Sequence, residues 1–210
     1  MRPTIWPDIN EQTMNESKLS ASAERLAQLA IPHFADRGYD AASMNDIAGL
    51  AGLKKATLYA HFSGKDDLYQ ASFDLALSAE LLHVKSHFQT DAQAHALPGL
   101  SYWWQLQQRF TEHDSLRFVL RSAFYPPAVL RQEVMSGFNR YLSYLRSRIE
   151  ELVDSSKYCG APKFTGSLVE VYMAAVDSLY IELIYGDELG FKRRVEAFER
   201  LFEFVRQHDL

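Results

Sequence analysis

The segment from Phe34 to Leu68 predicts two short helices joined by a tight turn, and it constrains the fold more than any other part of the chain. Gly38 follows a helical run and can adopt the left-handed conformation that ends a helix. Ser43 and Asp46 have the spacing of a capping box, so a new helix is predicted directly after Ser43. The small residues of Ala51-Gly52-Leu53 then form the kind of turn that joins the crossed helices of a helix-turn-helix unit.

The spacing of apolar residues predicts helices along nearly the whole chain, and hence an all-α fold. A second capping box, Ser63 with Asp66, predicts the start of a long helix on which Leu68, Ala79 and Leu82 share the apolar face. Besides the short pair, helices are expected at about 18–37, 64–88, 101–113, 115–124, 127–153, 164–185 and from 191 onwards.

Several residues of the first segment recur at fixed spacings: Phe34, Gly38-Tyr39, Ser43, Ile47-Ala48, Ala51-Gly52-Leu53, Thr57-Leu58-Tyr59, His61-Phe62, Lys65 and Leu68. This pattern closely resembles the amino-terminal DNA-binding domain of the tetracycline-repressor (TetR) family of bacterial regulators, over about Ser20 to Glu80. Lys54 departs from it, because the family usually has a small hydroxyl residue there. The resemblance implies an N-terminal three-helix helix-turn-helix DNA-binding domain followed by a C-terminal helical ligand-binding and dimerisation domain.

The expected domain boundaries follow from this resemblance. Residues 1–18 are polar, contain Pro3 and Pro7, and are predicted to form a flexible tail. Residues 19–80 form the predicted DNA-binding domain, with the motif at 43–62. Residues 81–210 form the predicted ligand-binding and dimerisation domain.

The resemblance implies that the second helix of the motif enters the major groove of double-stranded DNA. Its side chains would reach base edges and phosphates, while Leu58 and Phe62 are expected to hold the helices together. The net charge of −5 does not suit a non-specific DNA binder, yet Lys54 to Lys65 holds three lysines, His61 and no acid. The predicted DNA-binding residues are Ser43, Met44, Lys54, Lys55, Ala56, Thr57, Tyr59, His61 and Lys65.

The body is expected to bind a small apolar or amphipathic effector that releases the protein from its operator. The stretch from Tyr102 to Tyr125 is rich in aromatic residues, which line helical pockets but are more often core. Arg117 or Arg121 could anchor a carboxylate, which leaves an amphipathic acid open as the effector. The predicted ligand-binding residues are Trp103, Phe110, Phe118, Arg121, Tyr125, Tyr172 and Tyr180.

The last two predicted helices carry more apolar surface than one small core needs. The resemblance implies that they pair with those of a second copy as a four-helix bundle. The protein is therefore expected to be a homodimer that binds a pseudo-palindromic operator. Charges introduced at Phe198 and Phe202 are expected to split this dimer or to unfold the chain.

Other chemistry has little support in the sequence. His83 and His87 lie one helical turn apart and His95 follows, but no further ligand is well placed, so solvated histidines are favoured over a metal site. No nucleophile–base arrangement or phosphate-binding glycine loop appears, so we expect no catalytic residue, no cofactor and no enzyme. The alternative is a helical small-molecule-binding protein or enzyme without operator-specific DNA binding. A single cysteine, Cys159, and no membrane-length apolar run indicate a cytoplasmic protein without a membrane partner.

Overall fold

The computed structural model describes residues 19–90, 99–155 and 162–207, and within these ranges every regular element is a helix. This confirms the all-α class. Cys159 and His95, which the sequence singled out, lie outside the described residues. The elements are α1 (Ala21–Ala41), α2 (Met44–Leu50), α3 (Lys55–Tyr59), α4 (Lys65–Thr90), α5 (Leu100–Glu112), α6 (Asp114–Phe124), η3 (Ala128–Leu130), α7 (Arg131–Ser155), α8 (Pro162–Tyr185) and α9 (Glu188–Gln207).

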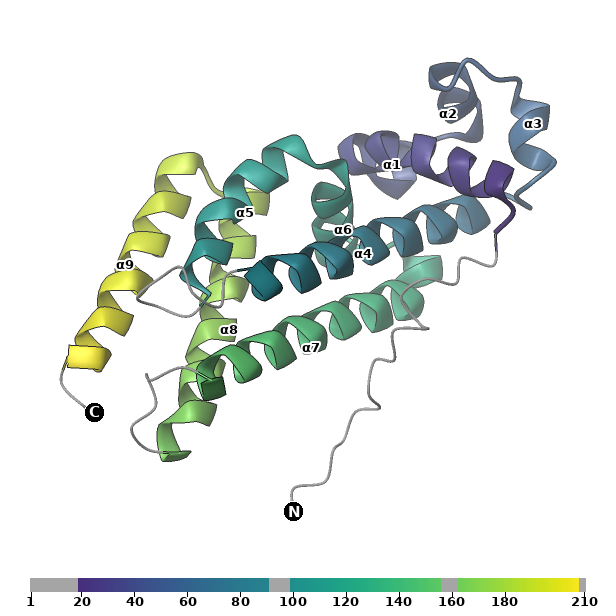
Figure 1. Cartoon of the computed structure of the whole chain (residues 1–210). Coiled ribbons are helices and arrows are strands. Elements are labelled where there is room, and N and C mark those ends of the chain that lie inside the picture. The colour runs from purple at the N-terminus through teal and green to yellow at the C-terminus, as the bar shows by residue number, and fades with distance from the viewer. Residues whose placement is uncertain (1–18, 91–98, 156–161, 208–210) are drawn as a thin grey trace.

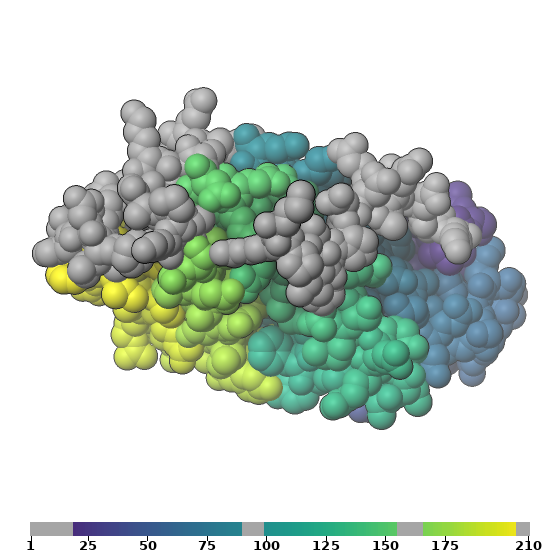
Figure 2. All heavy atoms as spheres, turned by 90° about the horizontal axis from the view of Figure 1, so that it is seen from below, coloured from purple at the N-terminus to yellow at the C-terminus, as the bar shows by residue number. Residues whose placement is uncertain are grey.

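Figure 1 shows an elongated arrangement in which α1, α2 and α3 gather at one end and α8 and α9 lie at the other. The long helix α4 runs from the first group into the body, where α7 packs beside it. The same order appears along the face seen in Figure 2, from the blue headpiece to the yellow carboxy-terminal helices. We call α1 to α3 the headpiece and the remaining helices beyond α4 the body.

An aromatic cluster joins the headpiece to the body. Phe118 of α6 stacks on Phe34 of α1 with ring centroids 5.7 Å apart, and it meets Tyr69 and Phe73 of α4 edge-on at 5.0 and 6.1 Å. All four rings are buried. The Tyr69 hydroxyl also shares a 2.7 Å hydrogen bond with Ser122 of α6. Phe118, a predicted ligand residue, therefore belongs to the core that fixes α1 against α4 and α6.

The buried face of α4 differs from the predicted one. Leu68 is fully buried, but Ala79 is exposed and Leu82 is 61% exposed. The helix instead buries two polar residues, Glu80 and His87, the second of which was predicted to be solvated. α4 contacts α1 and α6 near its start and α7 along its length, so its buried stripe follows its neighbours.

Among the helices of residues 19–90, 99–155 and 162–207, none combines the length and apolar character that crossing a bilayer requires.

Candidate nucleic-acid interface

The two short helices of the headpiece are positioned by local hydrogen bonds. The hydroxyl of Ser43 accepts a 3.1 Å hydrogen bond from the backbone N–H of Asp46, which confirms the predicted cap of α2. Gly38 has φ of +72° and breaks the helical conformation of α1, as predicted. Gly52 has φ of +66°, a conformation that side-chain-bearing residues rarely adopt, and it directs the chain from α2 into α3. The N–H of Leu53 closes this turn with a 2.8 Å bond to the carbonyl of Ala48.

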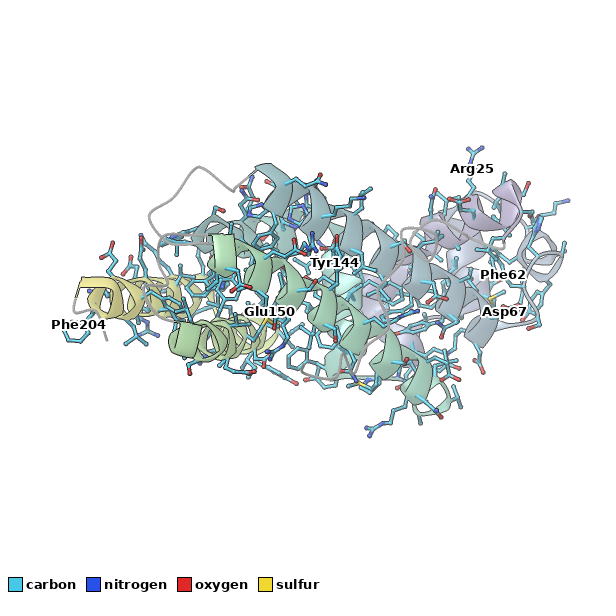
Figure 3. All side chains as sticks on the ribbon, turned by 60° about the horizontal axis from the view of Figure 1, so that its bottom comes forward. Arg25, Phe62, Asp67, Tyr144, Glu150 and Phe204 are labelled. Atoms are coloured by element: carbon cyan, nitrogen blue, oxygen red, sulfur yellow. The ribbon has the colours of Figure 1, made fainter. Side chains whose placement is uncertain are left out.

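The inner faces of α2 and α3 pack into the headpiece core. Ile47, Leu58 and Phe62 are buried, as expected for residues that hold the helices together. Figure 3 shows Phe62 at the headpiece end of the molecule. Met44 is also buried, at 5% exposure, so its side chain is a core residue, and only its backbone at the start of α2 remains available to a phosphate. The predicted DNA contact of the Met44 side chain is therefore corrected.

The outer face of α3 is polar, basic and exposed. Lys54, Lys55, Ala56, Tyr59 and His61 are exposed, while Thr57 is half-buried. The Lys55 ammonium lies 5.5 Å from the centroid of the Tyr59 ring, one helical turn along. No acidic residue stands between Lys54 and Lys65, so this face presents positive charge and hydrogen-bond donors together. Such a surface suits the phosphates and base edges of duplex DNA.

The amino end of α3 has no side-chain cap. Lys54 occupies the N-cap position, and its side chain makes no capping hydrogen bond. A small hydroxyl residue would satisfy one of the free backbone N–H groups of the first turn. These N–H groups are therefore left for solvent or a bound phosphate.

Lys65 has a structural role that the sequence did not reveal. Its ammonium donates hydrogen bonds to the carbonyl oxygens of Tyr39 and Ala42, at 2.8 and 3.1 Å, and lies 4.1 Å from the centroid of the Tyr39 ring. An ammonium has three donors. Lys65 therefore ties the start of α4 to the junction of α1 and α2, and it keeps one donor for a phosphate.

The cap of α4 uses a different acid from the predicted one. The backbone N–H and the hydroxyl of Ser63 both donate to a carboxylate oxygen of Asp67, at 2.9 and 3.2 Å. The predicted partner, Asp66, instead accepts a hydrogen bond from the hydroxyl of Tyr39. Because α4 begins at Lys65, Asp67 is its third residue, which is the position that a capping carboxylate requires.

Two predicted ligand residues of the body pack against each other. Trp103 of α5 stacks on Tyr172 of α8 with centroids 4.7 Å apart, and the Tyr172 hydroxyl donates to the carbonyl of Gly99 at 2.9 Å. Phe198 and Phe202 of α9 contact the same tryptophan, at 5.8 and 5.5 Å. These two phenylalanines therefore hold α9 to its own chain, so charges there would disturb folding before association.

Tyr180 belongs to a closed triangle of buried tyrosine hydroxyls. The hydroxyl oxygens of Tyr102 and Tyr141 lie 2.6 Å apart, those of Tyr141 and Tyr180 2.8 Å, and those of Tyr102 and Tyr180 3.2 Å. Burial raises the pKa of Tyr102 to about 12 and also raises the pKa values of Tyr141 and Tyr180 well above the ordinary value of a tyrosine. The three neutral hydroxyls satisfy one another and join α5, α7 and α8.

The histidine pair of α4 faces the interior, in contrast to the solvated position predicted for it. His87 is buried and its Nε2 lies 3.0 Å from the Ser101 hydroxyl, while both His83 and His87 pack against the Tyr102 ring. Burial, with the neighbouring positive charges, lowers the pKa of His83 to about 3. Among the described residues, no group of three or more histidine, cysteine or acidic side chains is arranged to hold a metal ion.

A buried ion pair lies one turn before these histidines and was not predicted. The Arg109 guanidinium of α5 lies 2.6 Å from the Glu80 carboxylate of α4, whose side chain is only 3% exposed. Burial raises the pKa of Glu80, and the attraction of Arg109 opposes that rise. An ion pair between a glutamate and an arginine on separate helices cannot be predicted from the sequence, because no fixed spacing along the chain is typical of such a pair.

The remaining predicted ligand residues line a cleft. Phe110, Arg121 and Tyr125 border a hollow of about 500 Å³ between α5, α6, α8 and the end of α1. This volume lies in the range of small-molecule sites. The predicted ligand residues therefore lie in four places. Phe118 is in the aromatic cluster at the headpiece, Trp103 and Tyr172 contact each other, Tyr180 is in the tyrosine triangle, and the other three line this cleft.

Large apolar side chains remain exposed on the last two helices. They are Val171, Ile181 and Tyr185 on α8, and Leu189, Leu201 and Phe204 on α9. Figure 3 shows Phe204 at the end of the molecule opposite to Phe62. Glu170 and Asp177 lie on the exposed side of α8 as well, and Glu170 forms a two-point ion pair with Arg146 at 2.7 and 2.9 Å.

A capped helix, a glycine turn and a second short helix with a basic outer face define a helix-turn-helix DNA-binding headpiece. Residues 28–72 match the model of the bacterial regulatory proteins of the tetR family. The headpiece is therefore similar to the DNA-binding domain of tetR-family regulators, and the relatives that match it are named as transcription regulators.

Two curated relatives match the headpiece region. The transcriptional activator FasR of Mycolicibacterium smegmatis is 53% identical over 51 residues, which are 23% of this chain and 23% of that protein. The negative transcriptional regulator IcaR of the Staphylococcus aureus biofilm operon is 34% identical over 74 residues, 33% of this chain and 40% of that protein. The chain thus matches less than half the length of either relative.

Solved structures extend the likeness to the whole fold. The reduced form of NemR from E. coli has a TM-score of 0.66 at 13% identity, covering 86% of this chain and 97% of that one. AibR in complex with isovaleryl coenzyme A and operator DNA has a TM-score of 0.55 at 14% identity, covering 84% and 95%. At these identities the likeness shows the fold alone, which is that of TetR-family regulators.

Proposed function

We propose that this protein is a homodimeric transcription regulator that binds a pseudo-palindromic operator through α3 and leaves it when a small molecule binds the body. The exposed face of α3, with Lys54, Lys55, Tyr59 and His61 and no acid among them, is the observation that carries the proposal. The curated relatives support a role in transcription, and they include both an activator and a negative regulator.

The residues of the α3 face have distinct roles in this proposal. Lys55 and Thr57 reach base edges or phosphates from within the helix, because its residues lie closest to the floor of the major groove. Tyr59 and His61 bond phosphates at its carboxyl end, and Lys54 does so at its amino end. Ser43 keeps its capping bond, and its hydroxyl, which donates to a carboxylate oxygen of Asp46 at 2.7 Å, turns to a phosphate when DNA binds.

Dimerisation is proposed through the exposed faces of α8 and α9. Leu201 and Phe204 are 47% and 52% exposed on α9, and Ile181 is 43% exposed on α8. Burying these side chains against a second copy would remove apolar surface from water at about 25 cal/mol per Å². A two-fold dimer also presents two α3 helices, which bind successive major grooves when they lie about 34–36 Å apart.

The protein is released from DNA if the effector binds more tightly to a dimer whose two α3 helices are not spaced to enter successive major grooves. A ligand shifts the equilibrium between two conformations only by its difference in affinity for them. α4 is the element that carries such a shift, because it starts in the headpiece and ends in the body. AibR, which shares the fold, was solved with both isovaleryl coenzyme A and operator DNA, which supports a protein of this fold that binds a small molecule as well as an operator.

The test is selection of DNA fragments from the source genome by the full-length protein, followed by binding titrations on the selected fragment. We expect nanomolar, salt-sensitive affinity that falls at least about a thousandfold on a scrambled sequence. Weak binding that is equal for all sequences would refute the proposal and favour a small-molecule-binding protein without an operator. Sedimentation in the same buffer should show a dimer, and a folded monomer at micromolar concentration would contradict the proposed assembly.

A further inference from the structure

The cleft between α5, α6 and α8 combines two guanidinium groups with an apolar wall. Arg117 and Arg121 stand one helical turn apart on α6 and both line it. Phe110, Tyr125, Leu183 and Ile184 form the apolar part of the lining. A hollow of about 500 Å³ holds a molecule of roughly ten to twenty non-hydrogen atoms with room to spare.

The two arginines differ in how far their charge is already compensated. Arg117 pairs with Asp36 of α1 at 3.2 Å and also with Asp114 at the start of α6. Arg121 makes one long hydrogen bond, 3.4 Å from its Nη1 to the carbonyl of Ala35. Among the residues that the structure describes, no carboxylate lies within ion-pairing distance of Arg121 although it is half-buried. Among the described residues, its other donors have no hydrogen-bond partner.

We propose that this cleft binds an organic carboxylate whose apolar group is aliphatic or aromatic. The carboxylate lies on Arg121, where two parallel N–H···O bonds suit the planar guanidinium, and Arg117 adds a second positive charge. The apolar group lies against Tyr125, Leu183 and Ile184. A neutral ligand would leave Arg121 without an anion, so the charge selects carboxylates over the corresponding amides.

The site is coupled to the headpiece through α1. Ala35 and Asp36 form the opposite rim of the cleft and are the residues that Arg121 and Arg117 contact. Gly38 lies directly after them, so close that a Cβ there would stand 3.0 Å from the Nε of Arg121. A carboxylate bound between the two arginines competes with the Ala35 carbonyl for the guanidinium of Arg121 and with Asp36 for the guanidinium of Arg117. Binding therefore weakens the contact of α1 with α6 and changes the position of α2 and α3.

This coupling, but not the binding itself, rests on the proposed function. Calorimetry of the full-length protein with octanoate and benzoate, each matched to its uncharged amide, tests the site without DNA. We expect at least one carboxylate to bind about tenfold or more tightly than its amide. Equal affinity for acid and amide, or no binding with a dissociation constant below about 1 mM, would overturn the proposal.

Three variants separate the site from the fold. Arg121→Gln should lose the preference for the acid, and Arg121→Lys should restore part of it. Tyr125→Ala, at a residue that is 60% exposed, should weaken both acid and amide several-fold without unfolding. Arg140→Gln removes an exposed arginine of α7 and should change nothing. An Arg121→Gln protein that is folded by circular dichroism and still prefers the acid would refute the assignment.

A second experiment measures DNA affinity by the fluorescence anisotropy of the selected DNA fragment. The carboxylate should weaken DNA binding by the wild type, and the operator should weaken carboxylate binding by the same factor. The DNA affinity of Arg121→Gln should be the same with and without the carboxylate. Carboxylate binding that leaves DNA affinity unchanged would refute the coupling. A protein that binds the carboxylate but no DNA would refute the proposed function and leave the carboxylate site intact.

Discussion

Replacement of Arg109 by methionine is expected to lower the free energy of unfolding by about 3–5 kcal/mol at neutral pH. The Glu80 side chain is 3% exposed, and the guanidinium of Arg109 at 2.6 Å is its only ion-pair partner among the described residues. Methionine fills much of the arginine volume, so lost packing contributes little. The cost arises because a charged carboxylate is left where water cannot replace the lost partner.

The stability lost in Arg109→Met should depend on pH. Burial raises the pKa of Glu80 in the folded protein, and loss of Arg109 removes the attraction that limits this rise. A carboxyl group with a raised folded pKa destabilises the fold as the pH rises through that pKa. The loss caused by Arg109→Met should therefore be largest at neutral pH and should shrink as the pH falls and the isolated carboxyl becomes protonated.

Urea denaturation at pH 7 and at pH 5, at one fixed protein concentration, measures both effects. Arg200→Met is the matched control, because Arg200 is 74% exposed and its ion pair with Glu196 should contribute at most about 1 kcal/mol. Adding Glu80→Gln to Arg109→Met should recover part of the loss, since no buried charge then remains. A cost below about 1 kcal/mol, or one that is equal at both pH values, would refute the reasoning.

Three further predictions concern assembly, acid stability and the headpiece. Leu201→Asp should yield folded monomers in sedimentation, whereas Phe202→Asp should unfold the chain because Phe202 packs on Trp103; a wild-type-like dimer of Leu201→Asp would rule out this face. The folded pKa of His83, about 3, lies below the ordinary value of 6.5, so the free energy of unfolding should fall as the pH drops below about 6.5. His83→Gln should reduce this fall in urea titrations. An unchanged pH profile would contradict the buried position of His83. Lys65→Met removes two hydrogen bonds to backbone carbonyls and should cost about 2–5 kcal/mol in thermal unfolding, with an unchanged midpoint counting against this role.

Local features of the fold could be predicted from the sequence because they depend on neighbouring residues. The glycine at 38 ends the regular part of α1, and the hydroxyl of Ser43 caps α2. Both depend on groups within a few positions along the chain. Leu58 and Phe62 were predicted to hold the helices together, and both are buried. The all-α class was accessible for the same reason.

Features that depend on distant partners could not be predicted in this way. The capping carboxylate of α4 moved from Asp66 to Asp67 because Tyr39, on another helix, binds Asp66. The burial of Glu80 was not predicted, because its partner, Arg109, comes from α5. The ligand candidates shared an aromatic character but not a location, and Phe118 packs against the headpiece. Composition indicates which residues are apolar, and only tertiary packing decides which of them enclose space.

The outer face of α3 is the surface that we propose binds DNA. The effect of salt concentration on the DNA affinity of Lys55→Ala tests this proposal. Each phosphate contact adds about −0.9 to the slope of log K against log salt concentration. Lys55→Ala should weaken binding of the selected fragment and make this slope less steep by up to about one if Lys55 meets a phosphate, or change the base preference at its position if it meets a base. Lys192→Ala, an exposed lysine of α9, should match the wild type. A folded Lys55→Ala protein with wild-type affinity, slope and sequence preference would contradict the account.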